Sequence, residues 1–365
     1  MKIKKDKYKF IVVAIALTTG IAFAVLRPAP IFMDSEAYSQ IAKEVAAGRG
    51  FASTALNRMQ AVNPLYPAFL ALIYKIFGIN YNLVKIIQVI IFSFTCLVIF
   101  KIGELIFNED IGFYSALLVA LHPVMASTAS HLLTECLYTF LLALGILFLI
   151  LSFTKSNKWL YFLTGLILGL GLLSRSTGLL FPVFILIGLF IILRDKLDAI
   201  KNFLILCLGL IIVISPWIIY NYRFFRSIQP LNNMGGRVFW YGTYVPAKGD
   251  PDSEIAHKAF ESVTEKIKEE GIDQVKEPVK WDRRLYWKGL KNIIEHPFGY
   301  VSLFPKNVFR LWIGTHSSFF TIGDFKFSAF LKDRELLKKH PFVFIWKMFI
   351  LSTSFVTFCL AILGI

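Results

Sequence analysis

Two carboxylates stand close together in the stretch Met33-Asp34-Ser35-Glu36-Ala37-Tyr38, shortly after the first long apolar run. A charge near a bilayer surface is costly unless it is paired or takes part in chemistry. On a helix, Asp34 and Tyr38 share a face, whereas Asp34 and Glu36 do not. Asp34 is therefore a candidate proton acceptor, and Glu36 and Tyr38 are candidate substrate-positioning residues. The alternative is that Asp34 caps the helix that follows.

His131 and Glu135 form a second polar pair, at the end of a predicted hairpin. Their spacing of four places them on one face of a helix, where they could bind a divalent ion or pair with each other. One histidine and one carboxylate are too few ligands to identify a metal site, so a capped hairpin at the headgroup level is the favoured interpretation. No cofactor is certain, and a divalent cation is left open.

Three arginines stand next to apolar segments. Arg175 lies in a Ser/Thr/Gly turn between two apolar helices, which suits an anion clamp. Arg58 precedes the element Asn63-Pro64-Leu65-Tyr66-Pro67, and Arg223 follows a later apolar run. Each arginine alone also fits a residue that snorkels to lipid headgroups. All three arginines are predicted to lie on the same side of the membrane as Asp34, which favours binding of a lipid-linked phosphate. Tyr66 is a further candidate for positioning the substrate.

The composition indicates the kind of molecule that must hold these groups. The chain has 365 residues, of which 56% are hydrophobic and only 17% are charged. These values exclude a soluble enzyme, a disordered tail and a disulfide-stapled secreted module. The net charge of +15 reflects an excess of Lys and Arg. In a membrane protein, such residues set the orientation of the chain and contact anionic lipid headgroups. No basic run is interleaved with exposed aromatics, so nucleic acid is not an expected partner.

The apolar runs predict an all-α polytopic membrane protein with seven or eight transmembrane helices. A basic start followed by an apolar run also fits a cleaved signal peptide, but we interpret it as an uncleaved first span. The positive-inside rule then places the N-terminus in the cytoplasm and the candidate site on the extracytoplasmic side of the cell membrane. The predicted spans are 11–26, 82–107, 111–127, 132–153, 159–173, 179–193, 203–220 and 342–365, and 298–312 is a further interfacial or spanning piece.

These runs divide the chain into three predicted parts. Residues 1–220 form a transmembrane core that includes a first outer loop, 27–81, with interfacial helices at 35–47 and 64–77. Residues 221–340 form a small, mainly helical extracytoplasmic segment, with helices expected at 252–271 and 281–294. Residues 341–365 form a C-terminal transmembrane helix.

Five short motifs occur in a fixed order relative to these spans. They are Asp34…Tyr38…Ala42 ending at Gly48-Arg49-Gly50-Phe51, Asn63-Pro64-Leu65-Tyr66-Pro67, Leu133-Thr134-Glu135, Leu173-Ser174-Arg175-Ser176-Thr177-Gly178 with Pro182, and Ser215-Pro216-Trp217…Asn221-Tyr222. Together they make the chain resemble the GT-C superfamily of membrane glycosyltransferases, in the branch of the protein O-mannosyltransferases and the lipid A aminoarabinose transferase.

The resemblance implies transfer of a sugar from a polyprenyl-phosphate-linked donor to an acceptor on the outer face of the membrane, and the acceptor could be a glycan, a lipid or a protein. It maps the catalytic carboxylates to Asp34 and Glu135. Our own hypothesis is an inverting transfer in which Asp34 acts as the base. Basic side chains would hold the donor phosphate, and further polar groups would position the substrate. The phosphate-binding candidates are Arg58, Arg175 and Arg223, and the positioning candidates are Glu36, Tyr38, Tyr66 and His131.

Two other classes of function fit an apolar chain of this kind. A lipid or sugar-lipid transporter or flippase would need ionisable residues near the middle of the bilayer and, in most cases, internal repeats. Here the ionisable groups cluster at the ends of the spans, and no repeat is visible. The other alternative is a non-catalytic GT-C relative whose outer segment binds a partner.

Overall fold

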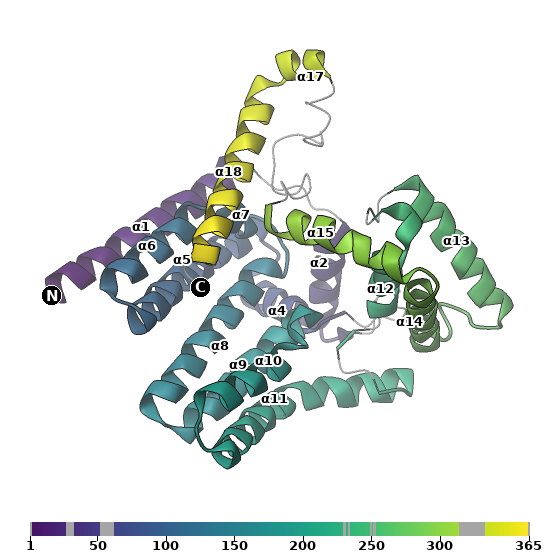
Figure 1. Cartoon of the computed structure of the whole chain (residues 1–365), viewed down its shortest axis with the longest axis horizontal. Helices are drawn as coiled ribbons and strands as arrows, with labels where there is room; N and C mark the ends of the chain where they lie inside the picture. Colours follow the sequence, from purple (N-terminus) through teal and green to yellow (C-terminus); the bar gives the residue numbers. More distant parts are fainter. Residues whose placement is uncertain are drawn as a thin grey trace. The chain divides into compact units, whose positions relative to one another are not determined.

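The computed structural model describes residues 2–26, 33–51, 62–228, 231–232, 234–248, 250, 253–313 and 333–363 (Figure 1). These residues form helices and turns, and no strand occurs among them. The prediction of an all-α polytopic membrane protein is therefore confirmed. The chain divides into two compact units, Met1–Asn232 and Asn233–Ile365. The boundary falls twelve residues beyond the predicted core, 1–220, because α11 runs on to Phe225 and Leu231 packs in the first unit.

Five of the described helices are long and apolar enough to cross a membrane. They are α1 (Lys2–Leu26), α5 (Tyr81–Ile106), α8 (Glu135–Lys155), α11 (Lys196–Phe225) and α18 (Pro341–Leu363). Two other predicted spans appear as shorter apolar helices, α9 (Lys158–Ser174) and α10 (Phe181–Ile192). The predicted span 111–127 is broken into α6 (Glu109–Leu121) and α7 (Pro123–Thr128). Proline lacks a backbone N–H and disfavours the α conformation of the residue before it, so the break falls at His122.

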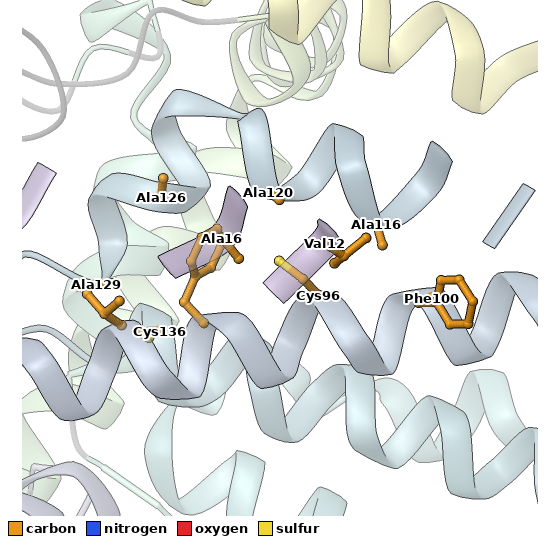
Figure 2. Close-up of a cluster of buried hydrophobic side chains, with 11 residues drawn as sticks. Val12, Ala16, Cys96, Phe100, Ala116, Ala120, Ala126, Ala129 and Cys136 are labelled. Atoms are coloured by element: carbon orange, nitrogen blue, oxygen red, sulfur yellow. The ribbon is translucent and has the colours of Figure 1, made fainter. Parts of the chain in front are cut away.

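In the first unit, α1, α5 and α6 pack through small residues. Figure 2 shows Val12 and Ala16 of α1 facing Cys96 of α5 and Ala120 of α6 in one buried cluster. Glycines bring α5 and α6 closest together, since a Cβ atom on Gly103 would lie 2.7 Å from the Cα of Gly112. Close backbone approach of this kind is how apolar helices associate where water supplies no driving force.

Charged side chains join one end of these three helices. Lys4 Nζ lies 2.7 Å from Asp110 Oδ1, and Lys5 forms an ion pair with Glu104. Lys101 Nζ lies 3.0 Å from the other oxygen of Glu104. The basic start of the chain is therefore paired with acidic groups of α5 and α6 at this end.

The opposite, Tyr81, end of α5 meets two short helices. These are α2 (Met33–Ala46) and α4 (Leu65–Phe77), which agree with the helices predicted at 35–47 and 64–77. Gly48 follows α2 with φ 78°, the left-handed conformation that ends a helix. The Ser39 hydroxyl lies 3.1 Å from the Tyr74 hydroxyl and 3.3 Å from the Tyr81 hydroxyl, so it joins α2 to both α4 and α5.

The second unit is built on its own aromatic core of Trp240, Ile267, Trp281 and Leu285. Its helices are α12 (Gly235–Thr243), α13 (Glu254–Glu269), α14 (Pro278–Glu295), α15 (Pro297–Ile313), α17 (Arg334–Lys339) and α18. The helices predicted at 252–271 and 281–294 are confirmed as α13 and α14. Asp282 of α14 is 5% exposed and accepts hydrogen bonds from the Gly236 and Arg237 N–H groups at the start of α12.

Candidate active site

Asp34 lies in the first turn of α2 and is exposed. Because α2 begins at Met33, the carboxylate is inside the helix, where the partial positive charge of the N-terminus favours it. Asp34 and Tyr38 share one face of this helix, as predicted. Glu36 points elsewhere, and its Oε1 accepts a hydrogen bond of 3.3 Å from Gln40 Nε2.

Tyr38 is the residue around which the predicted site gathers. Burial, together with the Asp34 and Glu135 carboxylates, raises the pKa of its phenol to about 12. The Arg175 guanidinium and a hydrogen bond with the Thr134 side chain act in the opposite direction. Groups from α2, α8 and the turn after α9 therefore all act on the charge of one phenol. The structure thus brings together Asp34, Tyr38, Glu135 and Arg175.

Arg175 and Glu135 form the ion pair of this cluster. Arg175 Nη1 donates hydrogen bonds of 2.5 Å to Glu135 Oε1 and 3.1 Å to Thr134 Oγ1. Glu135 is the first residue of α8, where a negative charge is favoured, and Arg175 follows the last residue of α9. The two side chains are 33% and 35% exposed, so the pair remains within reach of a ligand.

A polar network holds the turn that carries Arg175. Asn63 Oδ1 accepts hydrogen bonds from Ser176 Oγ at 3.2 Å and from Asn232 Nδ2 at 2.6 Å. Asn232 Nδ2 also lies 2.7 Å from Ser176 Oγ, and Asn63 Nδ2 donates to the Leu172 carbonyl. Sequence reasoning missed Asn232, because a single asparagine in a loop gives no signal of a partner 169 residues away.

Tyr66 and Gln88 hold the turn before Glu135. Tyr66 is fully buried, and its hydroxyl donates a 2.8 Å hydrogen bond to Gln88 Oε1. Gln88 Nε2 donates to the carbonyls of Ala129 at 3.1 Å and His131 at 2.7 Å. Tyr66 is therefore linked through Gln88 to the backbone of this turn. Gln88 was missed, although a polar residue inside an apolar span is a signal for such a role.

The prediction that His131 and Glu135 share one face of a helix is wrong. The helix α8 begins only at Glu135, and His131 lies in the preceding turn, 5% exposed. Its Nδ1 atom lies 2.8 Å from the Ser127 carbonyl and 3.1 Å from Ser130 Oγ. Within the described ranges no three His, Cys, Asp or Glu side chains form a group that could hold a metal ion.

The other two predicted arginines do not join the cluster in the described part of the chain. Arg58 lies outside the described residues. Arg223 is exposed in the last turn of α11, and no described contact connects it to Glu135 or Arg175. Arg175 is thus the one predicted phosphate-binding arginine that the described residues place beside the carboxylates.

An apolar groove opens next to the Arg175 turn. The helices that enclose it, α8, α9, α10 and α11, are neighbours in Figure 1. Two of its lining residues, Leu172 and Gly178, flank Arg175 three positions away on either side. The full lining is Tyr138, Leu142, Leu168, Gly171, Leu172, Gly178, Phe181, Pro182 and Leu210. The cavity volume is about 10 Å³, so this apolar surface beside Arg175 has room for no more than a water-sized molecule as it stands.

A known family matches the middle of the chain. Residues 61–220 match the family described as dolichyl-phosphate-mannose-protein mannosyltransferase. No curated protein and no solved structure matches the chain. The matched range contains Glu135, Arg175 and the whole apolar groove, and Asp34 precedes it. The resemblance seen in the motifs is therefore supported over this range, where the chain is similar to a family of membrane glycosyltransferases.

Proposed function

We propose that the protein transfers a sugar from a polyprenyl-phosphate donor to an acceptor hydroxyl at the extracytoplasmic surface of the membrane, with inversion at the anomeric carbon. The observation that carries this proposal is the gathering of Asp34, Glu135 and Arg175 around Tyr38. A carboxylate that can take a proton and a guanidinium that can meet a phosphate are the two groups that such a transfer needs. The family match favours a transferase over a transporter.

Asp34 is the proposed base. Its carboxylate is exposed and takes the proton of the acceptor hydroxyl as the oxygen attacks the anomeric carbon. The bond between that carbon and the phosphate oxygen breaks, and polyprenyl phosphate leaves with the electron pair. General base catalysis of this kind contributes about 10²–10⁴-fold to the rate. The sugar–phosphate linkage is already activated, so no ATP is needed.

Arg175 is the proposed cation for the leaving phosphate. Charge develops on the bridging oxygen in the transition state, and a positioned donor there is worth roughly 3–4 kcal/mol. Glu135 holds the guanidinium in place through the 2.5 Å hydrogen bond. Arg58 and Arg223 are retained as proposed further cations for the phosphate.

The remaining predicted residues have supporting roles in this proposal. Glu36 and Tyr38 position the substrate from α2, whereas Tyr66 and His131 fix the turn that leads to Glu135. Among the described residues, two carboxylates act on Tyr38, which is fewer than the three or more ligands of a protein metal site.

The test is transfer by the purified protein from a panel of polyprenyl-phosphate sugars, with Asp34→Asn as the decisive variant. We expect turnover to fall by about 10²-fold or more, because the amide cannot accept the proton. Asp110→Asn is the matched control, since Asp110 is an exposed carboxylate that pairs with Lys4 at the other end of the core. A folded Asp34→Asn protein with full turnover would exclude Asp34 as the base.

A further inference from the structure

Lys85 is a buried cation without a partner in the described part of the chain. It lies in the second turn of α5 and is only 7% exposed. No described residue forms a hydrogen bond or an ion pair with it. Lys4, Lys5 and Lys101 at the opposite end of the same helices behave differently, because each pairs with a carboxylate.

The position of Lys85 on α5 directs it toward the candidate site. Tyr81, Lys85 and Gln88 are spaced i, i+4 and i+7, so they share one face of the helix. The Tyr81 hydroxyl contacts Ser39 of α2, and Gln88 contacts Tyr66 of α4 and the His131 carbonyl. At about 1.5 Å of rise per residue, Lys85 stands about 6 Å from Tyr81 and about 4.5 Å from Gln88 along the axis. It therefore lies between two residues that both reach elements of the site.

A buried ammonium group without a counter-charge destabilises a protein, because it has lost water and gained nothing in return. Ionisable residues inside membrane helices are accordingly rare, and they mark sites where a charge is used. The neighbours of Lys85 on its helix face, Tyr81 and Gln88, are neutral. An anion from outside the described residues would supply the counter-charge that Lys85 lacks among them.

We propose that Lys85 binds the phosphate group of a lipid at the Tyr81 end of α5. The inference rests on the proposed function when the lipid is the polyprenyl-phosphate carrier, whose phosphate would then meet a second cation besides Arg175. Arg175 is already partly neutralised by Glu135, so a full positive charge is still lacking at the site. The same chemistry would bind the phosphate of an anionic bilayer lipid, and the experiment separates these two sources.

The experiment measures lipid binding and stability on the same full-length protein. The wild type and Lys85→Met are placed in nanodiscs of zwitterionic lipid and titrated with a medium-chain polyprenyl phosphate or with phosphatidylglycerol. Charge-assisted hydrogen bonds predict a 10- to 100-fold loss of affinity in Lys85→Met, and Lys85→Arg should restore most of it. The empty Lys85→Met protein should unfold at the same or a higher temperature, because an unpaired buried charge has been removed. Lys101→Met, on the same helix, is the control and should bind like the wild type.

The two lipids separate this inference from the proposed function. Loss of polyprenyl-phosphate binding alone assigns Lys85 to the carrier. If the wild type binds phosphatidylglycerol but no polyprenyl phosphate, and Lys85→Met abolishes that binding, Lys85 is a headgroup site and the proposed donor class fails. Unchanged binding of both lipids by Lys85→Met overturns the inference. So does early unfolding of the empty variant, which would make Lys85 a structural residue.

Discussion

The ion pair between Arg175 and Glu135 leads to a prediction in which binding and turnover move in opposite directions. Glu135 competes with any phosphate for the same guanidinium, because Arg175 Nη1 already donates to its Oε1 at 2.5 Å. Replacing Glu135 by Gln removes that negative charge and keeps a hydrogen-bond acceptor of the same size. We expect polyprenyl phosphate to bind more tightly to Glu135→Gln, while sugar transfer becomes slower.

The magnitude follows from the exposure of the pair. With 35% and 33% of the two side chains exposed, the interaction lies toward the surface limit, and breaking it costs about 1 kcal/mol of stability. In Glu135→Gln a phosphate can bind Arg175 without breaking this ion pair, and about 1 kcal/mol corresponds to about a fivefold gain in affinity. Arg175→Gln should instead weaken phosphate binding and lower turnover by about 10²–10³-fold, as expected when a single transition-state donor is lost.

The assay combines three measurements on wild-type, single and double variants: affinity for polyprenyl phosphate, single-turnover transfer and chemical unfolding. The double variant Arg175→Gln/Glu135→Gln isolates the coupling between the two side chains. The reasoning is refuted if Glu135→Gln binds polyprenyl phosphate more weakly than the wild type. It is also refuted if the activity lost in Arg175→Gln equals the fraction of protein that has unfolded.

Three further predictions concern stability. Tyr66→Phe leaves Gln88 Oε1 without its hydrogen-bond donor in a fully buried site and should cost about 1–3 kcal/mol in the free energy of unfolding; a loss below about 0.5 kcal/mol would show that the bond is dispensable. Burial raises the pKa of Asp282 to about 6 from 3.8, so the folded protein holds this proton where the unfolded chain has lost it. The contribution of Asp282 to stability is present below about pH 4 and is lost as the pH rises through about 6. Over that range, the free energy of unfolding of the wild type should fall relative to that of Asp282→Asn by up to about 3 kcal/mol. Gly112→Ala should destabilise, because its Cβ would lie 2.5 Å from a backbone oxygen, whereas Gly188→Ala meets nothing within 4 Å and should stabilise α10 by about 0.5–1 kcal/mol; equal effects in thermal unfolding would contradict the packing.

Local rules were sufficient for much of the fold. The apolar spacing of 35–47 and 64–77 predicted α2 and α4 within two residues, because one buried face fixes a helix of this length. The broken span at 111–127 had a readable signal in Pro123, which marks the start of a new helix. The length of α11 was underestimated, since four of its first seven residues are polar or charged and interrupt the hydropathy signal.

The candidate site was predictable only where the sequence spacing is local. Asp34 and Tyr38 could be paired from their separation along one helix. The failure at His131 has a nonlocal cause, because Gln88 pins the backbone of that turn from another helix and keeps it from extending α8. The isolation of Lys85 was equally hidden, since a lysine near the end of an apolar run looks like a headgroup anchor until its burial is known.

The hydrogen bonds of residues 231–232 bear on how this protein could be recombined with its relatives. The Leu231 carbonyl accepts from Trp217 Nε1 at 2.8 Å, and Asn232 bonds to Asn63 and Ser176 beside the Arg175 turn. A chimera that exchanges the second unit at residue 220, where hydropathy changes, would replace both of these tethers with foreign loop. A crossover placed after Asn232 would exchange the second unit while leaving the brace of the Arg175 turn native.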